Sequence, residues 1–176
     1  MTPQEEAGKM VARWREYGGS PLSSKTLKVG KFTEMNSIPF EIQGLDHIVL
    51  RVRDLDRMVR FYCDILGCRM EREQAEIGLT QVRAGRSLID LVPVTGKLGR
   101  VGGAAPGKEG RNLDHFCITI DGYDEARIRA YLTAHGVEVG EAGSRYGAEG
   151  EGPSLYVTDP EGNVVELKGP PWQAGA

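Results

Sequence analysis

The order of apolar and polar positions repeats once along the chain. Two short apolar runs, "HIVLRV" at 47–52 and "HFCITI" at 115–120, each come directly after the dipeptide Leu-Asp. Runs of this length, rich in β-branched residues, predict strands. Each predicted strand begins with a histidine, and His47 and His115 are 68 residues apart (115 − 47). Because the segments after the two strands also match, the chain is predicted to contain two related modules.

A helix is predicted after the first strand of each module. In the first module the apolar residues recur at i, i+3, i+4 and i+7, as in an amphipathic helix; they are Leu55, Met58, Val59, Tyr62, Ile65 and Leu66. Asp54 is expected to cap this helix and Gly67 to end it. A similar apolar stripe in the second module includes Tyr131 and ends at Gly136.

Further strands are predicted after each helix. They lie in "LTQVRA" (79–84) and "SLIDLVPV" (87–94) in the first module, and in "SLYVTD" (154–159) and "NVVELKGP" (163–170) in the second. The order β-α-β-β-β, used twice, predicts an α+β fold. We place the domain at 41–170, with modules at 45–94 and 113–168 and a glycine-rich linker at 95–112. Residues 1–40 form an N-terminal extension that would either cap the fold, pack on a partner or be partly disordered, and 171–176 form a tail.

The first and last strands of each module carry one histidine and one acid. His47 is matched with Asp90 of "SLIDLV", and His115 with Glu166 of "NVVELK". Since alternate side chains of a strand share a face, these groups are expected among apolar residues. A buried carboxylate or imidazole without a partner is costly, and a divalent cation would relieve four such groups that converge. Two imidazoles and two carboxylates suit zinc, nickel, manganese or iron.

Composition excludes some classes of protein. The chain has 176 residues, a net charge of −3 and a pI of about 5.7. Nucleic acid and anionic membranes attract basic faces, so neither is an expected partner. No apolar run approaches the ~20 residues of a membrane span. The three cysteines, Cys63, Cys68 and Cys117, form no C-x-x-C pair; they indicate a reducing cytoplasm and are expected to be small buried residues.

Three stretches, "LDHIVLRVRDLDRMVRFYCDILG", "LDHFCITI" and "SLYVTDPEGNVVELKGP", resemble the vicinal oxygen chelate superfamily. This superfamily includes glyoxalase I, fosfomycin-resistance thiol transferases, extradiol dioxygenases and bleomycin-resistance proteins. The resemblance covers about 45–168 and is closest to small glyoxalase-like proteins. It implies two βαβββ modules that form a cupped mixed sheet around a metal cleft, with the first and last strands of each module as neighbours. It also implies a homodimer, with modules paired either within one chain or across two.

The resemblance assigns metal ligands residue by residue. The family's ligands match His47, His115 and Glu166. Asp90 stands where glyoxalase I has a glutamate, and its shorter side chain would reach the metal either directly or through water. Glu166 is also the candidate catalytic base for a glyoxalase-like proton transfer, the alternative being that it is a ligand only.

Two residues flank the last hairpin and are candidates for holding an anionic or thiol-bearing substrate. They are Arg145 and Tyr156. The alternative for Arg145 is an ordinary surface residue, and for Tyr156 a core residue.

The expected function is that of a metal-dependent lyase or isomerase of a small oxygenated molecule, which stabilises an enediolate or oxyanion. The alternatives are an extradiol dioxygenase with Fe(II), a thiol transferase, and a drug-binding protein without catalysis. An extradiol dioxygenase usually needs a further histidine in the cavity. The third histidine, His135, is instead expected to have a structural role at the end of a helix.

Overall fold

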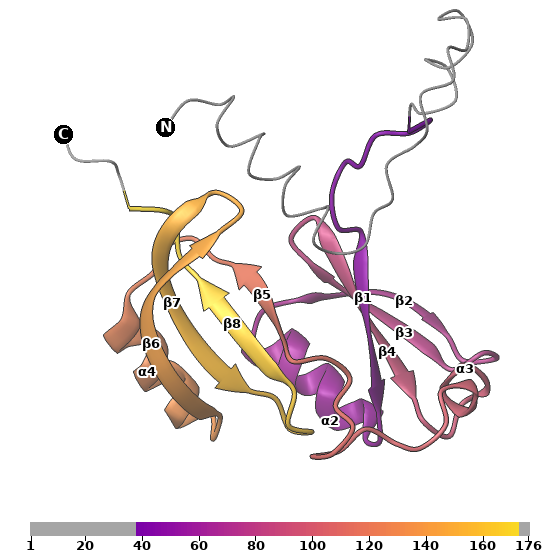
Figure 1. Ribbon diagram of the computed structural model, residues 1–176. Coiled ribbons are helices and arrows are strands. Elements are labelled where there is room, and N and C mark those ends of the chain that lie inside the picture. Colours follow the sequence, from indigo (N-terminus) through magenta and orange to yellow (C-terminus); the bar gives the residue numbers. More distant parts are fainter. Residues whose placement is uncertain (1–37, 173–176) are drawn as a thin grey trace, which may run out of the picture. The chain divides into compact units, whose positions relative to one another are not determined.

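The computed structural model describes residues 38–172 of the chain (Figure 1). The chain divides into two units, Met1–Gln43 and Gly44–Ala176. Most of the predicted N-terminal extension and of the C-terminal tail therefore lies outside the described residues. The repeat lies in the second unit. Among the described helices, none combines the length and the apolar character that crossing a membrane requires.

The second unit contains two four-stranded sheets, one for each module (Figure 1). The first consists of β1 (His47–Val52), β2 (Arg69–Gln74), β3 (Leu79–Ala84) and β4 (Ser87–Pro93), in the order β1-β4-β3-β2. The second consists of β5 (His115–Thr119), β6 (Glu138–Gly147), β7 (Gly150–Thr158) and β8 (Val164–Lys168), in the order β5-β8-β7-β6. In each sheet the first and last strands pair in parallel and the other pairs are antiparallel. The predicted α+β fold is thereby confirmed.

The helix predicted in the first module has two parts. Asp54 caps α2 (Leu55–Arg60), and its side chain accepts from the backbone N–H of Arg57 at 3.0 Å, as predicted. The helix then continues as a π-helical turn, η1 (Phe61–Ile65). The apolar spacing thus predicts which face of this helix is buried. It does not predict the π-helical turn, which depends on the pattern of backbone hydrogen bonds. In the second module α4 (Glu125–Ala134) is followed by Gly136, whose φ of 71° suits a helix end.

The linker between the modules is ordered around Arg51. It contains a short helix, α3 (Lys97–Val101), which the apolar pattern does not predict. The Arg51 guanidinium donates to four backbone carbonyls at 2.7–3.2 Å, those of Gly99, Gly102, Gly103 and Ala104. A Cβ at Gly99 would lie 2.0 Å from the carbonyl oxygen of Pro93. Glycine is therefore required there for close approach of the backbone.

One core joins the two modules. Side chains of α2 and η1, such as Met58 and Tyr62, belong to the same buried cluster as Leu132 of α4 and Val165 of β8. The Tyr62 ring also packs against Phe116 of β5, with ring centres 6.4 Å apart. The helix of the first module thus contacts the sheet of the second.

The turn between β7 and β8 fixes this contact through a buried aspartate. Asp159 Oδ1 accepts from the backbone N–H groups of Glu161 and Asn163, both at 2.9 Å. Its Oδ2 accepts from the Asn163 amide at 2.7 Å and from the buried Tyr62 hydroxyl at 2.8 Å. Burial, and then the charge of Asp159, raise the pKa of Tyr62 well above its ordinary value. The hydroxyl therefore remains a donor to Asp159.

The same turn makes two further attachments to the rest of the chain. The Glu161 carboxylate accepts from the backbone N–H groups of Arg53 and Asp54, just before α2, at 2.7–2.9 Å. Asn112 at the end of the linker donates to Asn163 at 3.0 Å. The segment "DPEGN", predicted only as a turn, is thus also a polar attachment between the modules.

Replacing Asp159 should destabilise the whole domain. Asp159→Ala removes an acceptor of four hydrogen bonds and leaves the Tyr62 hydroxyl buried without a partner. We expect a loss of about 3 kcal/mol in the free energy of unfolding, measured by urea denaturation. Asp121→Ala, at an exposed aspartate, is the control and should cost little. Equal small losses in both variants would contradict the role given to the turn.

Candidate metal centre

A buried carboxylate lies at the middle of the second sheet. Glu166 of β8 is 6% exposed and is paired in register with Cys117 of β5 and Tyr156 of β7. Its Oε1 accepts from the Ser154 hydroxyl at 2.5 Å, and its Oε2 faces the Tyr156 hydroxyl at 3.4 Å. The imidazole Nε2 of His115 lies 3.6 Å from the same Oε2. The sheet thus places the predicted histidine and acid side by side.

The first sheet repeats this arrangement with different donors. Asp90 of β4 is also 6% exposed and is paired with Val49 of β1 and Gln81 of β3. The Gln81 side-chain amide donates to Asp90 at 2.9 Å. His47, two residues before Val49, shares this face. A hydrogen bond with Asp46, and then the charge of Asp90, raise the pKa of His47.

Both histidines contact the aspartate that precedes them. His47 Nδ1 is 2.7 Å from Asp46 Oδ1, and His115 Nδ1 is 2.6 Å from Asp114 Oδ1. These aspartates had no predicted role. The signal was nevertheless present, because the repeated unit is Leu-Asp-His and not histidine alone.

The two histidine–acid pairs do not form one cluster of metal ligands among the described residues. His47 and His115 line the same cleft of about 920 Å³, which runs along the edge strands β1 and β5, but Asp90 and Glu166 are not among its lining residues. Over residues 38–172, no three His, Cys, Asp or Glu side chains gather as a metal ion would require. The structure therefore brings the four predicted ligands together as two pairs.

The two predicted substrate-binding residues lie near Glu166. Besides its contact with Glu166, Tyr156 meets the His115 ring edge-on, with ring centres 5.7 Å apart. The Arg145 guanidinium lies 5.6 Å from the centre of the Tyr156 ring and pairs with Glu141 at 2.7 Å. Arg145 thus packs on Tyr156, and Tyr156 contacts the carboxylate.

The prediction that all cysteines are buried is wrong for Cys117. This residue is exposed, while Cys63 and Cys68 are half-buried. The alternation along β5 places Cys117 on the same face as His115, beside Glu166. Partial burial of the thiol, and then the charge of Glu166, raise the pKa of Cys117 to about 11. The thiol is therefore protonated at neutral pH.

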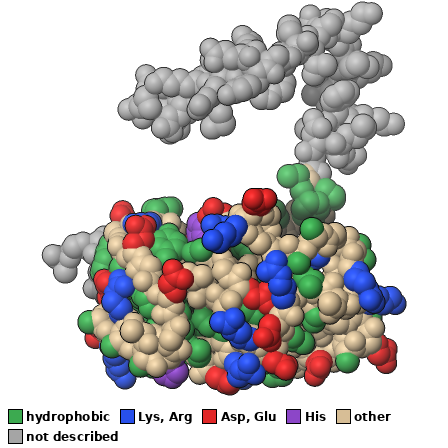
Figure 2. All heavy atoms as spheres, turned by 90° about the horizontal axis from the view of Figure 1, so that it is seen from below, with side chains coloured by type: hydrophobic (Ala, Val, Ile, Leu, Met, Phe, Trp, Pro, Cys, Tyr) green, Lys and Arg blue, Asp and Glu red, His purple; other side chains and the backbone are tan. Residues whose placement is uncertain are grey.

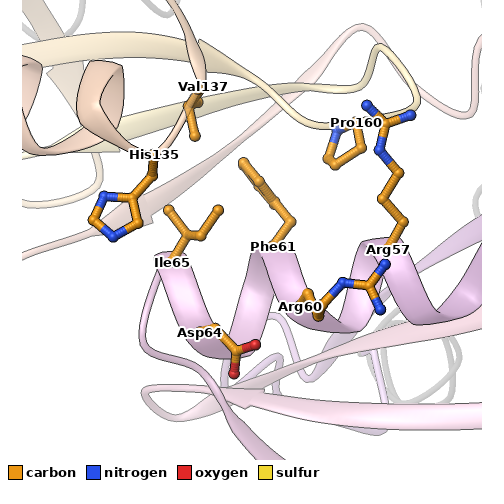
Figure 3. A pocket seen from close by; sticks show the side chains of 9 residues that line it. Arg57, Arg60, Phe61, Asp64, Ile65, His135, Val137 and Pro160 are labelled. Atoms are coloured by element: carbon orange, nitrogen blue, oxygen red, sulfur yellow. The ribbon is translucent and has the colours of Figure 1, made fainter.

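The third histidine lies at a different hollow, shown in Figure 3. This hollow of about 340 Å³ is lined by Arg57, Arg60, Phe61, Asp64, Ile65, His135, Gly136, Val137 and Pro160. His135 is the C-cap of α4, as expected, and its Nδ1 contacts the Tyr131 carbonyl at 2.8 Å. With two arginines and one carboxylate, the hollow does not offer the ligands of a metal site.

The surface offers no continuous basic stripe in the view of Figure 2. On that face Lys and Arg side chains alternate with Asp and Glu over the described residues. Nucleic acid would favour a basic face, which this view does not provide.

Comparison with known proteins gives a family match and several relatives. The family model "Glyoxalase/Bleomycin resistance protein/Dioxygenase superfamily" matches residues 44–167. Virulence protein STM3117 of Salmonella typhimurium is 26% identical over 143 residues, which are 78% of this chain and 91% of that protein. Its crystal structure gives a TM-score of 0.59 at 21% identity, over 74% of this chain and 99% of that one.

Two other matches differ in their named activities. Catechol-2,3-dioxygenase of Bacillus subtilis is 26% identical over 119 residues, which are 67% of this chain but only 38% of that protein. The crystal structure of the fosfomycin resistance protein FosX from Mesorhizobium loti gives a TM-score of 0.52 at 21% identity, over 73% of this chain and 93% of that one. At such identities the structural matches establish the fold alone.

Proposed function

Because the chain belongs to the Glyoxalase/Bleomycin resistance protein/Dioxygenase superfamily, we propose that it is a metal-dependent enzyme of the glyoxalase type, a lyase or isomerase of a small oxygenated molecule. One observation carries this proposal. Each sheet holds a carboxylate that is 6% exposed, on the same face as a histidine of the neighbouring strand. Buried charges are kept where they are paired or bind a metal, and carboxylates and imidazoles are both common ligands of divalent cations.

The donor atoms suit zinc, nickel, manganese or iron. His115 Nε2 and Glu166 Oε2 are 3.6 Å apart, which is too far for a hydrogen bond. Two ligands of one tetrahedral zinc ion, each about 2.1 Å from it, stand about 3.4 Å apart. The observed spacing therefore fits a pair of atoms that share an ion. Asp90, with the Gln81 amide on one oxygen, keeps its other oxygen for the ion or for a bound water.

Each pair is half of a site, and a second copy of the chain completes it. Among residues 38–172 neither pair has a third ligand within its own chain. The histidine-bearing strands β1 and β5 are both edge strands, and the His47 and His115 side chains are 46% and 40% exposed. In a two-fold dimer, His47 and Asp90 of one chain would meet His115 and Glu166 of the other, giving two equivalent sites.

The residues around Glu166 would carry out the proton transfer. When bound, a divalent ion polarises a substrate oxygen and stabilises the negative charge that develops on it. Glu166 would take a proton from the carbon beside that oxygen and return it to the neighbouring carbon. The Ser154 hydroxyl holds Oε1 of Glu166, so Oε2 would have to serve in turn as ligand of the ion and as the base. The Tyr156 hydroxyl would bond the substrate, and Arg145, packed on the Tyr156 ring, would attract an anionic group.

An extradiol dioxygenase is the second candidate, favoured by the similarity to catechol-2,3-dioxygenase. That similarity spans 38% of the dioxygenase, so its activity does not transfer directly. His135 lines the separate hollow of Figure 3 and is poorly placed to be the additional acid or base that such chemistry usually needs. Drug-binding relatives without catalysis generally lack the metal-ligand set, so His47, His115 and Glu166 count against that function. These points favour the lyase or isomerase.

Metal content tests the proposal first. Protein purified without chelators should hold about one transition metal per chain, since a two-fold dimer has two sites. His47→Ala and Glu166→Ala should each abolish this content in elemental analysis, whereas His135→Ala should retain it. Nickel, zinc or manganese would support a lyase or isomerase, and iron a dioxygenase. A wild-type chain that holds no metal and takes up none on titration would refute both enzymes.

A mixing experiment tests whether the sites lie between chains. Unfolded His47→Ala and Glu166→Ala chains, refolded together, should recover about a quarter of the wild-type metal capacity. The reason is that half of the dimers contain both variants, and each such dimer has one site with neither substitution. A mixture of His115→Ala with Glu166→Ala is the matched control and should recover nothing, because both changes lie in the second module. Equal capacity in the two mixtures would contradict shared sites.

A further inference from the structure

In both modules an aspartate contacts the Nδ1 atom of the histidine that is the candidate metal ligand. Asp46 Oδ1 and His47 Nδ1 are 2.7 Å apart, and Asp114 Oδ1 and His115 Nδ1 are 2.6 Å apart. Both aspartates are largely in solvent, with side chains 89% and 90% exposed. Among the described residues, each carboxylate bonds only to its histidine. Nothing in the packing of the core therefore accounts for these contacts.

A carboxylate in this position decides which imidazole nitrogen is free. An ionised carboxylate only accepts hydrogen bonds, so a neutral imidazole must carry its proton on Nδ1 to bond it. Nε2 then keeps its lone pair. In the second module Nε2 is the nitrogen that faces Glu166, at 3.6 Å. The aspartate thus leaves free the nitrogen that lies on the side of the acid.

The third histidine offers an internal comparison. His135 Nδ1 also contacts a pure acceptor, but this is the backbone carbonyl of Tyr131 at 2.8 Å. A carbonyl fixes the same tautomer without adding a negative charge. Of the three histidines, only His47 and His115, the two candidate metal ligands, have a carboxylate on Nδ1.

We propose that Asp46 and Asp114 are positioning residues that hold His47 and His115 as Nδ1–H tautomers and direct Nε2 toward a shared metal ion. This inference rests on the proposed metal site and adds to it the ligating atom and the residues that select it. A carboxylate hydrogen-bonded to a ligating imidazole also makes the imidazole a stronger donor, and its loss typically weakens metal binding by about 10-fold to 100-fold. The repeated Leu-Asp-His is then one functional unit used twice.

The first part of the test needs no metal. Long-range proton–nitrogen NMR correlations on metal-free protein with ¹⁵N-labelled histidine, at mildly alkaline pH, report the tautomer of each ring. Wild-type His47 and His115 should show a protonated Nδ1. Asp46→Ala should shift only His47, and Asp114→Ala only His115, toward protonated Nε2. His135 should show Nδ1–H in every variant, which also reports that the fold is intact.

The second part is a zinc titration in competition with a chelating dye. Asp46→Ala and Asp114→Ala should each bind zinc about 10-fold to 100-fold more weakly than the wild type. Asp121→Ala, at an exposed aspartate that does not precede a histidine, should match the wild type. An unprotonated Nδ1 in wild-type His47 and His115, or zinc affinities unchanged by both substitutions, would overturn the inference. The expected tautomers in a wild type that binds no zinc would instead refute the proposed metal function, and with it the metal role of the aspartates.

Discussion

The structure depends on keeping one carboxylate almost out of water in each sheet. Asp90 and Glu166 are both 6% exposed, and removing a carboxylate from water costs several kcal/mol even after relaxation. Hydrogen bonds from side chains of the neighbouring strand offset this cost. The donors are Gln81 in the first module, and Ser154 and Tyr156 in the second. No described buried side-chain nitrogen or oxygen lacks a hydrogen-bond partner. The acids are thus held in place without a metal, as a site organised in advance requires.

The attachment between the modules determines how these acids are presented. The turn at 159–163 bonds to Tyr62 and to the start of α2, so the helix of the first module is held against the second. The histidines at the start of the edge strands β1 and β5 are left exposed. Within the described residues, the two histidine–acid pairs do not form one cluster of ligands. The proposed dimer would bring the two pairs together at shared sites.

Local patterns in the sequence predicted most elements of the fold, but not the positions of β2, β6 and α3. The apolar alternation, the helical spacing and the Asp54 cap each depend on neighbours in the chain, and the structure contains all three. The pairing of first and last strands came from the family resemblance, since no local pattern specifies which strands are neighbours. The same pairing then placed His47 on the face of Asp90, and His115 on that of Glu166.

The features that the sequence did not reveal depend on distant parts of the chain. The linker is ordered because the Arg51 side chain donates hydrogen bonds to backbone carbonyls about 50 residues further on, from Gly99 to Ala104. The role of "DPEGN" depends on Tyr62, almost 100 residues earlier. The separation of the four expected ligands into two pairs likewise depends on how the modules pack. Asp46 and Asp114 are different, since the repeated Leu-Asp-His is a local pattern that indicates them without any distant contact.

The most direct test of a shared metal site is anomalous X-ray diffraction from crystals of the metal-loaded protein, recorded on both sides of the metal's absorption edge. We expect one anomalous peak per chain, bound by His47 Nε2 and Asp90, or its water, from one chain and by His115 Nε2 and Glu166 from a second. A peak whose ligands all come from one chain would contradict the proposed half-sites. A peak away from these four residues, or none at all, would contradict the metal centre itself.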